Sequence, residues 1–206
     1  MELTFALTAF VTLFVVVDPI GLAPLFIALT PGATAAQRRR MGLRAVAIAA
    51  VLLTAFGFFG DALLASIGIS MPAFRIAGGV MLFLTALDML FERRTQRREG
   101  QQAEATHDPS VFPLATPLIA GPGAMATMIL LVGQGDGFGH LIGVHLVMLA
   151  VLGCCFALFL IAGSLERALG RTGTMVVTRL LGMLLAALAI QFMLDGLIGA
   201  GVIGRA

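Results

Sequence analysis

The chain has 206 residues, of which 59% are hydrophobic and only 12% are charged, and its mean hydropathy is +1.03. This composition is much more apolar than that of soluble domains of the same length, so it predicts an all-α integral membrane protein. The formal charge of +2 identifies no partner, and we expect no nucleic-acid binding.

Six apolar runs are long enough to cross a bilayer, whose core is about 30 Å thick and needs about 20 residues per helix. The runs lie near residues 3 to 29, 42 to 60, 71 to 91, 112 to 133, 139 to 163 and 174 to 197. Because they use most of the chain, we expect one membrane domain over residues 1–206, surrounded by lipid, with its site between the helices.

The basic residues predict the orientation of these helices. They gather after the first, third and fifth runs, at Arg38, Arg39, Arg40 and Arg44, at Arg93, Arg94, Arg97 and Arg98, and at Arg167 and Arg171. Cytoplasmic connections carry an excess of arginine, so we expect these loops in the cytoplasm and both termini outside the inner (plasma) membrane. The polar segment near 92–110 is the expected cytoplasmic linker between a first half, about 1–91, and a second half, about 111–206.

The first run contains a segment from Asp18 to Pro24 that an ordinary membrane helix does not need. Pro19 and Pro24 lack an amide hydrogen, and Gly21 lies between them, so we expect the helix to kink or unwind here. Backbone groups freed in this way need protein, water or a ligand as partners. The alternative is that the prolines are packing kinks only.

Asp18 lies near the middle of the bilayer, where an ionised carboxylate is unfavourable by about 3 kcal/mol. One interpretation is a group that binds a coupling proton or cation, or the amine of a substrate. The other is an N-cap for a half-helix that begins at Pro19. The two interpretations are compatible.

The fourth run repeats the proline spacing of the first, with Pro117 and Pro122 in place of Pro19 and Pro24. Thr116 occupies the position that matches Asp18 and is expected to cap a half-helix in the same way. The glycines here would let a substrate approach the backbone. The residues of this second stretch that we assign to a site are Thr116, Pro117, Gly121, Pro122, Gly123 and Ala124.

Arginines recur in the third and sixth runs, where Arg75 with Gly78 has the same spacing as Arg179 with Gly182. With the prolines, this indicates two related three-helix halves of opposite orientation, an inverted repeat. Arg75 lies near the outer end of its helix, and we expect it to pair with Asp18, with Asp61 or with a substrate carboxylate. The alternative is that its side chain snorkels outward to the surface. Arg179 would reach the cytoplasmic surface.

Gln191 lies deeper in the sixth run. It is expected to hydrogen-bond to a neighbouring helix or to substrate.

Four ordered motifs resemble those of the MarC family of six-helix bacterial and archaeal membrane proteins. They are Val17-Asp18-Pro19-Ile20-Gly21 with Pro24 and Phe26, Phe74-Arg75-Ile76-Ala77-Gly78-Gly79, the run from Pro117 to Ala124, and Arg179-Leu180-Leu181-Gly182 with the run from Gln191 to Gly196. The family is grouped with the LysE-type exporters, and some members are described as transporters of small neutral amino acids. This chain has Leu22 where the family often has Asn.

The residues and the resemblance together predict a secondary transporter of small neutral amino acids, coupled to protons or cations. Asp18 is the expected coupling group, and backbone amides near Gly121 to Ala124, or Arg75, would bind the substrate carboxylate. A channel and a non-transporting scaffold or assembly factor are the alternatives. We expect no enzyme activity, cofactor or metal, since no metal-ligand set or phosphate-binding loop is present, and association of several copies is left open. The predicted substrate-binding residues are Asp18, Pro19, Gly21, Pro24, Arg75, Thr116, Pro117, Gly121, Pro122, Gly123, Ala124, Arg179 and Gln191.

Overall fold

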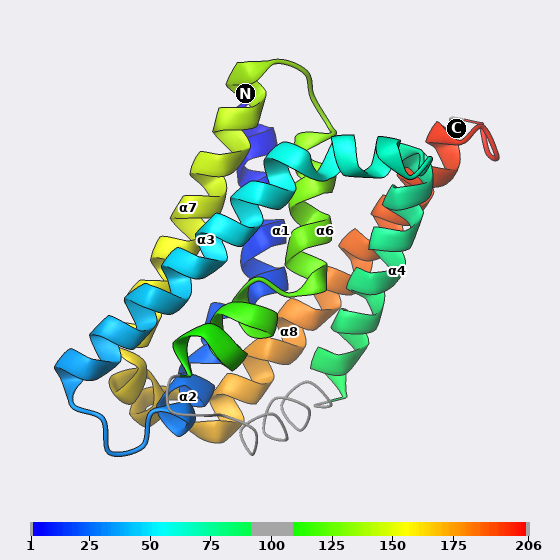
Figure 1. Ribbon diagram of the computed structural model, residues 1–206. Helices are drawn as coiled ribbons and strands as arrows, with labels where there is room; N and C mark the ends of the chain where they lie inside the picture. The colour runs from blue at the N-terminus through cyan, green and yellow to red at the C-terminus, as the bar shows by residue number, and fades with distance from the viewer. Residues whose placement is uncertain (1, 92–108, 205–206) are drawn as a thin grey trace.

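The computed structural model describes residues 2–91 and 109–204, and these residues form a bundle of helices (Figure 1). Its elements in chain order are α1 (Leu3–Val17), α2 (Pro19–Leu29), α3 (Ala35–Ser66), α4 (Met71–Leu90), η1 (Ser110–Ile119), α6 (Pro122–Val132), α7 (Phe138–Leu160) and α8 (Ala162–Gly199). The predicted all-α fold is therefore confirmed. Most of the predicted linker, with its arginines, lies outside the described residues.

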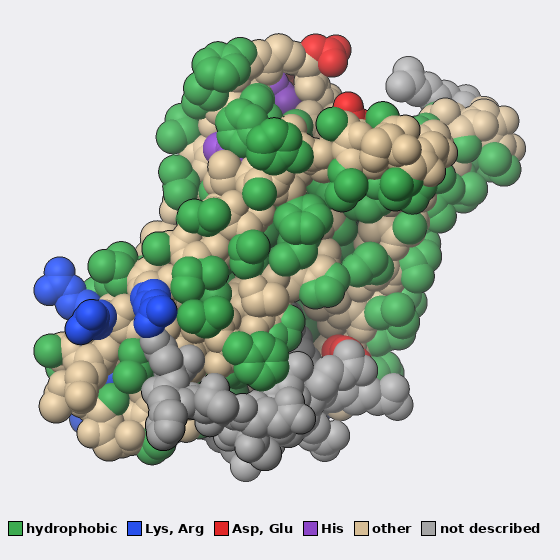
Figure 2. Space-filling view, in the orientation of Figure 1, with side chains coloured by type: hydrophobic (Ala, Val, Ile, Leu, Met, Phe, Trp, Pro, Cys, Tyr) green, Lys and Arg blue, Asp and Glu red, His purple; other side chains and the backbone are tan. Residues whose placement is uncertain are grey.

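Five helices, counting α1 and α2 together, are long and apolar enough to cross a membrane. The pair η1 and α6 makes a sixth span if it is taken as one bent helix, since its two parts meet at an angle of 53°. The predicted breaks in the first and fourth spans are both present. Side chains on the surface agree with this assignment, because large apolar residues such as Val51, Phe59 and Met183 are more than half exposed, and hydrophobic atoms are spread over the visible face in Figure 2.

The two ends of the bundle differ in character. Both chain termini lie at one end, which we call the terminal end (Figure 1). Arginine atoms gather at the other end in Figure 2, where α3 begins, and we call it the arginine end. There Arg38 donates hydrogen bonds to Oγ1 and to the backbone carbonyl of Thr30, both at 3.2 Å. This arginine therefore ties the start of α3 to the end of α2, where the helix dipole favours a cation.

The helix α3 runs well beyond the predicted span of 42 to 60. Its start is fixed by a capping box, in which Gln37 N–H donates to Thr34 Oγ1 and Thr34 N–H donates to Gln37 Oε1. These polar residues precede the apolar run, so hydropathy alone set the predicted boundary too far into the helix. The last helix is also longer than its predicted span. It is interrupted at Gly170, which has a positive φ of 61°.

The helix α4 packs against the second half of α8, and glycines lie at the points of closest approach. A Cβ at Gly79 would come within 2.8 Å of the carbonyl oxygen of Ala189, and a Cβ at Gly196 within 2.9 Å of that of Pro72. Gly182 faces α4 in the same way near the arginine end. The third helix of each predicted half thus pairs with its counterpart. The inverted relation between the halves stays a prediction.

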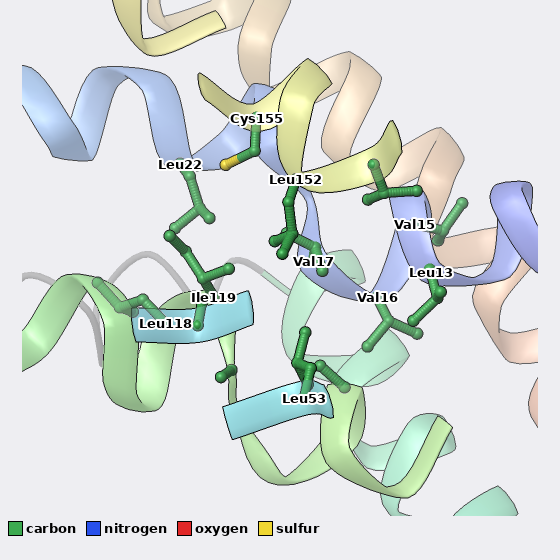
Figure 3. Packing of buried hydrophobic residues seen from close by; sticks show 14 of the residues in the cluster. Leu13, Val15, Val16, Val17, Leu22, Leu53, Leu118, Ile119, Leu152 and Cys155 are labelled. Carbon is green, nitrogen blue, oxygen red and sulfur yellow. The ribbon is translucent and has the colours of Figure 1, made fainter. Parts of the chain in front are cut away.

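The core between the helices contains buried side chains from both breaks. Figure 3 shows Val16, Val17 and Leu22, which flank the first break, packed in the same cluster as Leu118 and Ile119 from the second. All of these residues are less than a tenth exposed. The fold therefore places two segments that are about 100 residues apart in the chain against each other.

Candidate functional site

The first break is a single residue, Asp18, between α1 and α2. Its backbone lies in the left-handed region, with φ 54° and ψ 61°, a conformation that Asp and Asn adopt more readily than most residues. Its N–H donates to Phe14 O at 2.9 Å, and its own carbonyl accepts from Leu22 N–H at 3.0 Å. Helical hydrogen bonding thus continues on both sides of this break within the membrane span.

The carboxylate of Asp18 caps the helix that follows it. The side chain is 0% exposed, and Oδ1 accepts a hydrogen bond of 3.0 Å from Gly21 N–H. A Cβ at position 21 would overlap Asp18 Oδ2, so only glycine leaves room for the carboxylate. The predicted cap is confirmed. The role of Asp18 in coupling stays a prediction.

The two prolines of the first stretch have different positions. Pro19 is buried and begins α2, where its missing N–H is not needed. Pro24 lies inside α2, which continues to Leu29. Because Pro24 has no N–H, the carbonyl of Ile20 does not receive the usual helical hydrogen bond. The helix therefore breaks at Asp18, and Pro24 frees the carbonyl of Ile20, two residues after the break.

The second break is longer and less regular than the first. Thr116 has an extended backbone, with φ −132° and ψ 126°, inside η1, and the bond from it to Pro117 is cis. Gly121 is again extended, with φ −82° and ψ 171°, and α6 begins at Pro122. A Cβ at Gly121 would lie 2.5 Å from the carbonyl oxygen of Pro117, so the close turn here requires glycine.

The expected cap at Thr116 is wrong. The N-cap of α6 is Gly121, and no side chain caps this helix. Met125 N–H donates to Gly121 O at 3.0 Å, whereas the amides of Gly123 and Ala124 receive no side-chain cap. The two halves therefore match in proline spacing but differ in how the helix after the break is capped. The first half supplies a capping carboxylate, and the second supplies uncapped amides.

The two breaks lie next to each other. A Cβ at Gly123 would lie 3.5 Å from the side chain of Val16 and 3.5 Å from that of Leu82 in α4. Val16 lies two residues before Asp18, and Gly123 follows Pro122. Ala124 is buried and Pro122 is exposed. The structure therefore brings the residues beside the two breaks into contact.

Arg75 lies away from the breaks, in the first part of α4. Leu82, which faces Gly123, is seven residues further along α4, so Arg75 is about 10 Å closer to the terminal end. Its side chain is half-buried, and its Nε is buried without a hydrogen bond. The pairing of Arg75 with Asp18, Asp61 or a substrate carboxylate stays a prediction.

Arg179 and Gln191 also lie outside the region where the breaks meet. Both are exposed on α8. Gln191 Nε2 donates to Oδ1 of Asp195 at 2.8 Å, so the expected hydrogen bond to another helix is instead made within α8. These two residues are exposed, whereas Asp18 is buried. Gly182, three residues after Arg179, packs against α4.

Two buried hydroxyls that were not predicted from the sequence lie in this region: Thr12 and Thr127 are both 0% exposed. Since α1 and α6 run antiparallel past the Val16 and Gly123 contact, Thr12 and Thr127 each lie one turn closer to the terminal end. Their Oγ1 atoms donate to the carbonyls of Thr8 and Gly123, both at 2.8 Å. Each lies four residues from one of the contact residues Val16 and Gly123, but this spacing becomes a useful signal only once the two breaks are known to meet.

The chemistry of this region is that of reversible binding. A carboxylate, uncapped amides, freed carbonyls and hydroxyls can hold the charged groups of a small zwitterion or a cation. Among the described residues, no group of three or more His, Cys, Asp or Glu side chains could hold a metal ion.

Comparison with known proteins identifies the family. The model of the MarC family integral membrane proteins matches residues 3–200. A UPF0056 membrane protein of Methanocaldococcus jannaschii is 35% identical over 203 residues, covering 97% of this chain and 99% of the relative. YvbG of Bacillus subtilis is 35% identical, over 99% of this chain and 97% of its own length. The UPF0056 inner membrane protein YhgN of Escherichia coli is 33% identical, over 93% and 95%.

No solved structure is significantly similar to the chain. The family match nevertheless spans all the described helices from α1 to α8, and the identities to these relatives extend over nearly complete chains. The chain therefore belongs to the MarC family of integral membrane proteins.

Proposed function

We propose that the protein is a secondary transporter of small neutral amino acids such as glycine and alanine, coupled to protons or cations. The observation that carries this proposal is the contact between two interrupted membrane helices, one with a buried carboxylate and the other with uncapped amides. Interrupted helices that meet within the membrane are the usual construction of substrate and ion sites in secondary transporters.

The two breaks offer partners for both charges of an amino acid. The uncapped amides of Gly123 and Ala124 lie at the N-terminus of α6, where the helix dipole favours a carboxylate. Asp18 and the freed carbonyl of Ile20 would bind the ammonium group, or Asp18 would take the coupling proton or cation. The side chains of Val16 and Leu82 would lie 3.5 Å from a Cβ at Gly123. The space beside this backbone is therefore small, which favours a substrate with a small side chain.

Transport requires that this region open alternately to the two sides of the membrane. Asp18 is 0% and Ala124 only 2% exposed, so the described arrangement is closed around the breaks. In the proposed mechanism, one half rocks against the other, with the breaks as hinges and the glycine contacts of α4 and α8 as the sliding surface. The predicted inverted repeat would make the two open states similar in energy.

The proposed location is the inner (plasma) membrane, with the arginine end in the cytoplasm. Arg38, Arg39 and Arg40 at the start of α3 favour this orientation. The name of the relative YhgN, which describes an inner membrane protein, supports the membrane assignment.

The proposal is tested with purified protein in liposomes. We expect saturable uptake of labelled glycine or alanine, and accelerated exchange when unlabelled amino acid is present inside the liposomes. Flux without saturation or exchange would indicate a channel. Absence of any flux for every small neutral amino acid, in protein shown to be folded, would contradict transport and favour a scaffold or assembly factor.

A further inference from the structure

The described histidine His145 has an unused polar atom inside the membrane domain. Its side chain is only 9% exposed, and its Nδ1 lies 2.7 Å from the carbonyl oxygen of Leu141. Because a carbonyl oxygen can only accept, Nδ1 carries the hydrogen, and Nε2 of the neutral ring has a free lone pair. That Nε2 atom is buried and makes no hydrogen bond to any described residue. Figure 2 shows histidine atoms only as small patches near the terminal end.

The wall around this lone pair is apolar and tightly packed. A Cβ at Gly57 of α3 would lie 2.7 Å from Nε2 and 3.1 Å from the methyl group of Met128 in α6. The ring of Phe58 is tilted against the imidazole, with 4.6 Å between the ring centroids. The contact therefore accommodates a neutral imidazole, whereas a proton on Nε2 would place a charged N–H among groups that offer no acceptor.

A carboxylate lies one helical turn from this contact. Asp61 follows Gly57 by four residues, on the side of α3 that carries both Gly57 and Phe58, so it is about 5.4 Å further along the helix. Asp61 is exposed. Other elements packed here add no competing charge: α1 and α6 contain no ionisable residue, and His140 of α7 is held at Nε2 by Leu131 O at 2.9 Å.

We propose that His145 is a proton-binding site at the contact of α3 and α7, and that protonation of Nε2 replaces its contact with Gly57 by an ion pair with Asp61. Imidazole is the side chain whose charge in general responds to pH near neutrality, so pH is the variable that tests this exchange. The neutral ring holds α3 against α7. The protonated ring draws α3 along by about one turn, or turns toward Asp61, and loosens this part of the bundle.

This site does not depend on the proposed transport function. It lies on the terminal-end side of the breaks, because Met128 is six residues, or about 9 Å, from the start of α6. A proton that enters from the terminal end would meet His145 before Asp18. If the protein is a proton-coupled transporter, His145 therefore precedes the coupling carboxylate on the path.

The experiment uses the full chain in lipid nanodiscs with nitrogen-15 labelled histidine. The His145 signal is the one lost in His145→Asn, a variant whose amide N–H can still donate to Leu141 O. We expect this signal to show the Nδ1–H tautomer at pH 8 and to titrate as the pH falls to 5. Hydrogen exchange of residues 53–66 should increase over the same range. A ring that stays neutral to pH 5 would overturn the proposal.

Two variants separate the parts of the proposal. In His145→Asn the pH dependence of exchange should be lost, whereas the matched control His140→Asn should retain it. If the dependence persists in His145→Asn, another group is responsible and the proposal fails. Asp61→Asn should move the titration midpoint of His145 to lower pH, since the cationic ring loses its partner. An unchanged midpoint would contradict the ion pair.

Discussion

Asp18 combines two tasks that a single substitution can separate. Its carboxylate caps α2 through Gly21, and its backbone occupies the left-handed region. Asparagine performs both tasks without charge, whereas alanine performs neither. The site chemistry and the stability of the fold are therefore linked at this residue, and variants must be chosen with that in mind.

We predict that Asp18→Ala lowers the free energy of unfolding by about 2 to 3 kcal/mol, from the lost cap and the strained backbone. Asp18→Asn should remain within about 1 kcal/mol of the wild type, because Asn is an equally good cap. Thermal unfolding in detergent, followed by circular dichroism, measures the difference. Equal destabilisation by both variants would show that the charge, and not the cap, maintains the fold.

Arg75 lies about 10 Å from the breaks toward the terminal end, so its predicted role is on the substrate path rather than at the breaks. Its buried Nε has no hydrogen bond among the described residues. We predict that Arg75→Gln raises KM for amino-acid uptake roughly tenfold or more, since the substrate carboxylate loses a charge-assisted hydrogen bond on its way to the breaks. Arg179→Gln is the matched control from the second half, where the arginine is exposed. An equal KM in both variants would remove Arg75 from the substrate path.

At the scale of helices, the glycines between α4 and α8 set how closely the two halves approach. Gly79→Ala would place a methyl group 2.6 Å from Met193 Cγ and 2.8 Å from the Ala189 carbonyl. We predict that this overpacking lowers the free energy of unfolding by about 1 to 3 kcal/mol. Gly153→Ala, in α7, is the control, because nothing lies within 4 Å of its Cβ position and alanine is the better helix former. The prediction is contradicted if both substitutions change the free energy of unfolding in the same direction.

The helices and their breaks were predictable because each has a local cause. Hydropathy located the spans, and proline with glycine located the interruptions at Asp18 and at Gly121. The cap of the second break was not predictable from the proline match. Helix α6 starts at Pro122 and not at Pro117, and that choice depends on the turn in which Gly121 approaches the Pro117 carbonyl.

The contacts between helices could not be derived from one sequence. Thr12, Thr127 and His145 are unremarkable in their own segments, and their burial depends on which helix lies opposite. Arg75 was correctly placed near one end of its helix, but its distance from Asp18 follows only from the register of α4 against α6. Tertiary packing therefore determined which polar residues share the site.

At the scale of the whole molecule, the arginine end and the terminal end should face opposite sides of the membrane. We predict that, with Cys154 and Cys155 replaced by alanine, a cysteine at Gln134 is labelled in intact cells by a maleimide that cannot cross the membrane. A cysteine at Arg40 should react only after the cells are permeabilised. Both positions are exposed in the structure. The reverse pattern would invert the proposed topology.

The central claim is that the two breaks form a transport site in which Asp18 couples substrate movement to an ion gradient. The most direct measurement compares wild-type protein and Asp18→Asn in liposomes, with labelled glycine or alanine and an imposed proton or sodium gradient. We predict that the gradient drives accumulation by the wild type and that Asp18→Asn loses this accumulation while it stays folded. Accumulation that is unchanged in Asp18→Asn, or insensitive to any gradient in the wild type, would contradict the claim.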